Sequence, residues 1–115
     1  EANKPSESFA VIYRLRLKKA RVKRYQVLWN ELVDYFKSEC GAVGSCLHQA
    51  EDGMWVAYSR WPDQATRDKA WPKDKPPSQY LPKRIQAIIL EMKSCSDQRY
   101  RFDPIEMTVV NDKLI

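Results

Sequence analysis

Residues 45–63, SCLHQAEDGMWVAYSRWPD, decide the fold predicted for this chain. Strand-like runs flank Asp52-Gly53 on both sides, and the second run, MWVAYSRW, is rich in the aromatic and β-branched residues that strands favour. An Asp-Gly pair between such runs favours a two-residue hairpin turn, because both turn positions require positive φ angles. The stretch therefore predicts a β-hairpin that turns at Asp52-Gly53.

The predicted turn also sets which residues share a face of the hairpin. It places His48 opposite Ala57, so that His48, Trp55 and Trp61 lie on one face and Tyr58 lies on the other. A slip of one residue would exchange the two faces. The positions expected for the aromatic residues therefore depend on this register.

The rest of the chain shows both strand-like and helix-like periodicities. Residues 8–18 alternate, with Tyr13 on a wholly apolar face and Ile12 and Arg14 on the other. Apolar residues at three- and four-residue steps predict amphipathic helices. The elements expected outside the hairpin are strands over 8–18 and 101–112, helices over 22–41, 63–71 and 80–95, and an irregular loop over the proline-rich residues 72–79.

This order of elements is strand, helix, strand, strand, helix, strand, with a small helix after the third strand. It is the split βαβ pattern of the ferredoxin-like α+β fold, a four-stranded antiparallel sheet with helices on one face. The other face would carry Trp55, Trp61, His48 and Ile12, which is too much apolar surface to leave in water. We therefore expect a homodimer in which a second copy covers this face.

Length and composition are those of one globular domain. The chain has 115 residues, of which 43% are hydrophobic and 30% charged, and we expect a flexible N-terminal tail over 1–7 and a single domain over 8–115. No apolar run approaches the ~20 residues of a membrane span. Three cysteines without a CxxC pair argue against a zinc site and a disulfide framework, and favour a reducing cytoplasm.

The net charge of +5 is concentrated between Arg14 and Arg24, where seven cations occur without an acidic residue. Such a run can steer anions or nucleic acid. It can equally be a set of solvated side chains at a strand end and a helix start. The sequence alone leaves both interpretations open.

The hairpin and its flanks resemble a known family. The segment GAVGSCLHQAEDGMWVAYSRWPD, preceded by FAVIYRLRLK and followed by FDPIEMTVVNDKL, is similar to antibiotic biosynthesis monooxygenase-like proteins, from about Phe9 to Leu114. The resemblance implies a dimeric α+β barrel with a cavity between sheet and helices in each subunit. It also implies oxidation of small aromatic or polyketide-like molecules by dioxygen, without metal or flavin. Haem-degrading relatives use a histidine in the second helical region and an asparagine on the first strand, and this chain has neither.

Three residues are candidates for catalysis. His48, the only histidine, could remove a phenolic proton, because its free pKa lies near neutrality. Arg14, together with Arg16, could hold an oxyanion, and the hydroxyl of Tyr58 could reach the cavity. The alternatives are a histidine hydrogen-bonded at the barrel seam and arginines that are solvated or paired across the dimer.

Five aromatic residues are candidates for binding a flat ligand, since aromatic rings stack favourably. Trp55 and Trp61 could form a wall on the sheet, and Tyr13, Trp29 and Trp71 could line the cavity. The alternative is that these rings fill the core or the dimer interface. No metal cluster suggests itself, three glycines make no phosphate loop, and no cofactor is expected.

Two other functions compete with an oxygenase. One is a non-catalytic homodimer, with a small-molecule-binding or stress-related role. The other is RNA binding, since RNA-recognition domains share this order of elements and the chain is basic. GMWVAYSRW lacks the basic-glycine-aromatic sequence that leads into the RNA-binding strand, so a nucleic-acid partner is disfavoured.

Overall fold

The computed structural model describes residues 8–71 and 81–114 of the chain. The expected N-terminal tail, 1–7, and the expected proline-rich loop, 72–79, lie outside the described residues. The described elements follow the predicted order: β1 (Phe9–Leu15), the 3-10 helix η1 (Lys19–Arg21), α1 (Val22–Glu39), β2 (Gly44–Gln49), β3 (Trp55–Trp61), α2 (Gln64–Ala70), α3 (Lys83–Cys95) and β4 (Ile105–Thr108).

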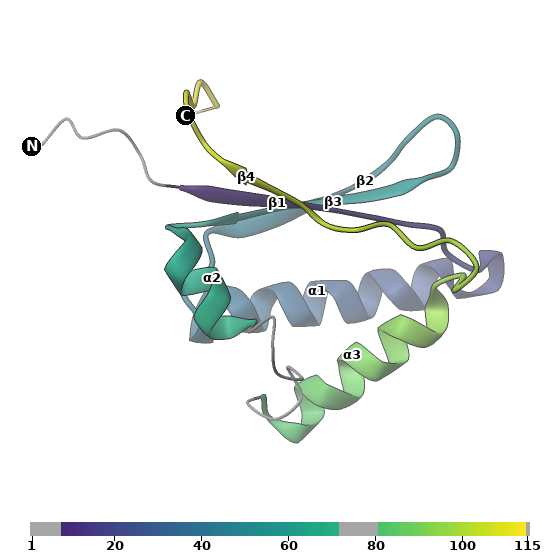
Figure 1. Ribbon diagram of the computed structural model, residues 1–115. Coiled ribbons are helices and arrows are strands. Elements are labelled where there is room, and N and C mark those ends of the chain that lie inside the picture. The colour runs from purple at the N-terminus through teal and green to yellow at the C-terminus, as the bar shows by residue number, and fades with distance from the viewer. Residues whose placement is uncertain (1–7, 72–80, 115) are drawn as a thin grey trace, which may run out of the picture.

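The four strands form one antiparallel sheet in the order β2-β3-β1-β4. All three α-helices lie on the same side of this sheet, with α1 nearest to it and α3 packed against α1 (Figure 1). The other side carries no helix, and both the tip of the β2-β3 hairpin and the C-terminal segment rise on that side (Figure 1). This arrangement confirms the predicted ferredoxin-like α+β fold.

The hairpin loop is one residue longer than predicted. The N–H of Ala50 donates to the carbonyl of Met54 at 2.7 Å, so the loop comprises Glu51, Asp52 and Gly53. In this loop Gly53 alone has a positive φ, 88°, which is the geometry of a three-residue hairpin loop. The carboxylate of Asp52 instead accepts the N–H of Met54 at 3.0 Å. The prediction of a two-residue turn is therefore wrong.

The longer loop moves the register by one residue. His48 pairs with Val56 rather than with Ala57, and the face of β3 that carries Trp55 and Trp61 turns toward the helices. The prediction that these two tryptophans cover the open face is wrong for this reason. His48 and Ile12 do lie on the open face, as predicted.

The core forms between the sheet and the helices. Leu28 of α1, Ile85 of α3 and Val11 of β1 have 1% or less of their surface exposed, and each contributes roughly 1.5–3 kcal/mol through its burial. α1 ends where Gly41 adopts a φ of 78°, as its position in the sequence predicts. Phe36 packs against both buried clusters and so joins the two ends of the core.

Candidate functional site

A cavity of about 220 Å³ lies between the helix-facing side of the sheet and the helices. Tyr13 and Trp61 come from neighbouring strands of the sheet, Trp29 and Phe36 come from α1, and Trp71 directly follows α2. Because side chains alternate along a strand, Tyr13 and Trp61 lie on the helix-facing side of the sheet and form one wall. Trp29 and Phe36 share one face of α1 and form the opposite wall. The cavity is therefore largely aromatic.

Phe36 holds two of the tryptophans of the cavity in place. Its ring lies 5.8 Å from that of Trp61 and 5.9 Å from that of Trp71, measured between centroids, with edge-to-face angles of 64° and 73°. Such pairs contribute about 0.5–1.5 kcal/mol beyond the area that they bury. This packing fixes the orientation of both indole rings toward the cavity.

One end of the cavity is polar, and we call Arg67, Tyr13 and Glu106 together the polar pole. Arg67, on α2, is only 3% exposed and lines the cavity. Its Nη2 donates to the Glu106 carboxylate on β4 at 2.6 Å, and its Nε donates to Asp68 at 3.0 Å. The guanidinium also lies 5.0 Å from the centre of the Phe9 ring. These contacts satisfy the buried cation in the way that burial requires.

The protonation states at the polar pole follow from these contacts. Burial raises the pKa of Tyr13 above its ordinary value, although the charge and hydrogen bonding of Arg67 lower it, and the charge of Glu106 raises it further. Burial would lower the pKa of Arg67, but hydrogen bonds to Glu106 and Asp68 raise it. At neutral pH the pole therefore presents a neutral phenol and a charged guanidinium.

A second polar point lies on the floor of the cavity. The hydroxyls of Ser45 and Ser59, which face each other on β2 and β3, are 2.8 Å apart. Both residues line the cavity. Since one hydroxyl donates to the other, the second hydroxyl keeps its proton for another acceptor.

Four of the five predicted ligand-binding residues line the cavity: Tyr13, Trp29, Trp61 and Trp71. Trp55 shares the helix-facing side of the sheet but lies at the far end of β3, opposite Leu15, and is not part of the lining. The structure therefore brings the predicted aromatic residues together, with Trp55 as the exception.

The three predicted catalytic residues all lie on the open face and do not line the cavity. His48 is exposed, and its Nδ1 lies 3.1 Å from the Val56 carbonyl. Arg14 donates to the Asp103 carbonyl at 3.2 Å and lies over the ring of Phe102. Tyr58, which we expected to reach the cavity, is directed away from it by the corrected register.

Arg67 and the two serines were not predicted as site residues. In the sequence Arg67 is one of several charged residues in a short polar helix, and its burial could not be foreseen. The serines carry a weak signal, since they stand opposite each other once the correct register is known. Their identification therefore required the structure.

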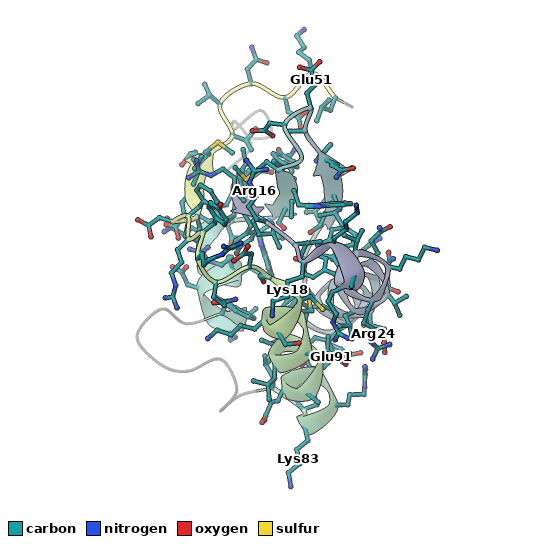
Figure 2. The ribbon with its side chains drawn as sticks, turned by 90° about the vertical axis from the view of Figure 1, so that its right-hand side faces the viewer. Arg16, Lys18, Arg24, Glu51, Lys83 and Glu91 are labelled. Atoms are coloured by element: carbon teal, nitrogen blue, oxygen red, sulfur yellow. The ribbon has the colours of Figure 1, made fainter. Side chains whose placement is uncertain are left out.

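The basic run between Arg14 and Arg24 is not one continuous charged surface. Arg16 donates to the Asp52 carbonyl at 2.8 Å, while Arg24 makes two hydrogen bonds of 2.6 and 2.8 Å to Glu91 on α3. Figure 2 shows Arg24 and Glu91 beside each other between the helices, with Arg16 near the sheet above them. Paired contacts of this kind favour the interpretation that the run consists of surface side chains.

The described residues contain no cluster of histidine, cysteine or acidic side chains suited to a metal ion. None of the described helices has the length and hydrophobicity that a membrane crossing requires.

The fold and the cavity together define a small ferredoxin-like α+β protein with an aromatic cavity between sheet and helices. No protein family model matches the sequence, and no curated protein matches it. Solved structures do match.

The cofactor-independent oxygenase SnoaB from Streptomyces nogalater is 12% identical over 95% of this chain and 99% of its own, with a TM-score of 0.68. Rv0793 from Mycobacterium tuberculosis is 13% identical over 92% and 98%, with a TM-score of 0.65. A structure called an antibiotic biosynthesis monooxygenase is 17% identical over 90% and 98%, with a TM-score of 0.59. At these identities the likeness shows the fold, and it is the fold that the sequence resemblance predicts.

Proposed function

We propose that this protein is an oxygenase that binds a small electron-rich aromatic molecule in the cavity and oxidises it with dioxygen, without a metal or a flavin. The observation that carries the proposal is a cavity with aromatic walls and one buried polar end. The shared fold of SnoaB, a cofactor-independent oxygenase, supports the reaction type. A fold hosts many functions, so the proposed function depends on the cavity.

The size of the cavity limits the ligand. An apolar cavity of roughly 150 Å³ holds benzene, and typical drug-sized ligands occupy about 300–1,000 Å³. The volume of about 220 Å³ lies between these values. We therefore infer a ligand of one or two rings rather than a polycyclic one.

The proposed reaction needs an electron-rich anion. A phenol or enol that loses its proton can reduce dioxygen directly, and oxygen then bonds to the ring carbon that held hydrogen. One dioxygen converts this C–H carbon and the phenolic C–O–H to a quinone and releases one water. Arg67 and the neutral Tyr13 hydroxyl would donate hydrogen bonds to the substrate oxygen where negative charge develops.

A second candidate is a protein that binds the same ligand without turnover. The observation that favours it is the position of His48, which lies on the open face, so that the described cavity lining contains no group with an ordinary pKa near neutrality. Both candidates need the cavity, but only the first consumes oxygen.

The test combines binding with oxygen uptake. Quenching of tryptophan fluorescence measures binding of 1-naphthol. An oxygen electrode measures oxygen uptake with 1-naphthol above the rate without protein, with 1,4-naphthoquinone as the expected product. Trp71→Ala should weaken binding about tenfold, since it removes a wall of the cavity, while the matched variant Trp55→Ala should leave binding unchanged. Binding without oxygen uptake would favour the second candidate, and absence of binding would refute both.

We also propose that a second copy of the chain covers the open face. This face carries Ile12, Val56, Tyr58 and Met107, which are half-buried, and Ile105, which is 40% exposed. Apolar surface of this kind marks an interface. Light scattering should give twice the mass of 13.5 kDa, and Ile105→Glu should produce a monomer.

The three free cysteines suit a reducing compartment, and we propose the cytoplasm.

A further inference from the structure

The charge balance at the polar pole restricts the ligand more than its shape does. Arg67 is the one cation that lines the cavity in the described chain, and two carboxylates already bind it. The side chain of Glu106 is 27% exposed and that of Asp68 is 46% exposed. The pole therefore has no surplus positive charge to offer to a ligand.

An arginine that recognises a carboxylate does so through an open fork of two parallel N–H groups. In this cavity Nη2 is engaged by Glu106 and Nε by Asp68, and the guanidinium also hydrogen-bonds the Tyr13 hydroxyl. The N–H groups left to a ligand can donate a hydrogen bond to an uncharged oxygen. An additional carboxylate would lie close to Glu106 and would be repelled by it.

The same contacts act on the hydroxyl of Tyr13, which also lines the cavity. Negative charge on that oxygen is opposed first by burial and also by Glu106, and Arg67 only partly offsets the two effects, so the pKa of Tyr13 is raised. A ligand oxygen bound beside the Tyr13 hydroxyl meets the same surroundings.

We propose that the cavity selects uncharged, oxygen-bearing aromatic ligands over aromatic carboxylates, and that Glu106 is the residue that determines this selection. The inference rests on the proposed ligand cavity but not on turnover. It is compatible with the proposed oxidation, because a phenol enters uncharged. Its charge arises only as the proton leaves, and both hydrogens that the substrate loses end in the water that the reaction releases.

The experiment compares ligands of one shape and different charge. At pH 7, 1-naphthoate is an anion, whereas 1-naphthamide is its uncharged counterpart of similar shape. Binding to the wild-type protein is measured by quenching of tryptophan fluorescence. We expect the amide to bind at least tenfold more tightly, which corresponds to about 1.4 kcal/mol. Equal binding, or tighter binding of the carboxylate, would overturn the inference without any variant.

The variant Glu106→Gln tests the residue itself. It removes the charge and keeps the shape, so the preference for the amide should fall about tenfold. Asp68→Asn is the matched control, since it removes a charge from the same guanidinium at a more exposed position, and should change the preference by less than threefold. An unchanged preference in a folded Glu106→Gln protein would refute the role of Glu106.

The outcome also separates this inference from the proposed function. If neither 1-naphthol nor 1-naphthamide binds to the wild-type protein, the ligand cavity itself is refuted. If both bind and the carboxylate binds equally well, the cavity stands and the charge selection fails. If Glu106→Gln does not fold, the comparison of amide and carboxylate in the wild-type protein decides the question.

Discussion

The contact between Arg67 and Glu106 should be a major source of stability, because it joins α2 to the edge strand β4. Loss of one partner of a buried ion pair typically costs about 3–5 kcal/mol. Here Glu106 is 27% exposed and Asp68 46% exposed, so water can partly hydrate the carboxylates that remain. We therefore expect Arg67→Met to lower the free energy of unfolding by about 2–3 kcal/mol, including the lost contact with Phe9.

A double-mutant cycle separates the pair from its surroundings. Glu106→Met leaves Arg67 with Asp68 as its one described carboxylate partner and should lower the free energy of unfolding by about 1–2 kcal/mol. In the double variant no buried charge lacks its partner, so its stability should lie within about 1 kcal/mol of the wild type. Urea unfolding followed by tryptophan fluorescence gives each value, provided that the dependence on urea stays unchanged.

The expected coupling between the two substitutions is about 2 kcal/mol or more. Asp68→Asn is the control, since that carboxylate contacts the same guanidinium from a position near the surface, and exposed pairs contribute about 1 kcal/mol or less. Additive losses, with a coupling below about 0.5 kcal/mol, would contradict the view that Glu106 is what holds Arg67 in the cavity wall.

Three further predictions concern the fold. Gly53→Ala should lower the free energy of unfolding by about 1–2 kcal/mol in a urea titration, because φ is 88° and the new Cβ, 3.5 Å from Arg16, has room; unchanged stability would contradict the loop. Thr66 donates to the Asp63 carboxylate through its hydroxyl and its amide, and these hydrogen bonds lower the pKa of Asp63. The cap on α2 should therefore be intact above the ordinary pKa near 3.8 and be lost as the pH falls through the lowered pKa. Helicity measured against pH, with Asp63→Ala as the control, tests this. Burial raises the pKa of Tyr25 from 10.0 to about 12, so stability should be complete below pH 10 and decline between pH 10 and 12, and Tyr25→Phe should reduce that decline.

The order and type of the elements could be predicted, because hydrophobic periodicity reports directly on which face of an element is buried. The apolar face of β1, with Phe9, Val11 and Tyr13, meets the helices as expected. Gly41 ends α1 where a left-handed residue was needed. These signals are local, and each depends only on the residues that carry it.

The hairpin register could not be predicted, because two loop lengths fit the same Asp-Gly pair. The choice between them depends on contacts that the sequence does not show. The carboxylate of Asp52 accepts the N–H of Met54 within the loop, and the Asp52 carbonyl accepts a hydrogen bond from Arg16, which directly follows β1. Since side chains alternate along a strand, this single residue moved Trp61 to the cavity and Tyr58 to the open face.

The residues of the candidate site likewise fall into those that a local sequence pattern predicts and those that it does not. Aromatic residues such as Trp29 and Trp71 are conspicuous in any sequence, and the fold needed only to bring them together. Arg67 and Glu106 are 39 positions apart, and each reads as an ordinary surface charge. The two side chains meet because the fold brings α2 to the edge strand β4. The charge balance around Arg67 is therefore a property of the tertiary structure. This is also why substitution of Glu106, which does not line the cavity, is the more informative test of what the cavity binds.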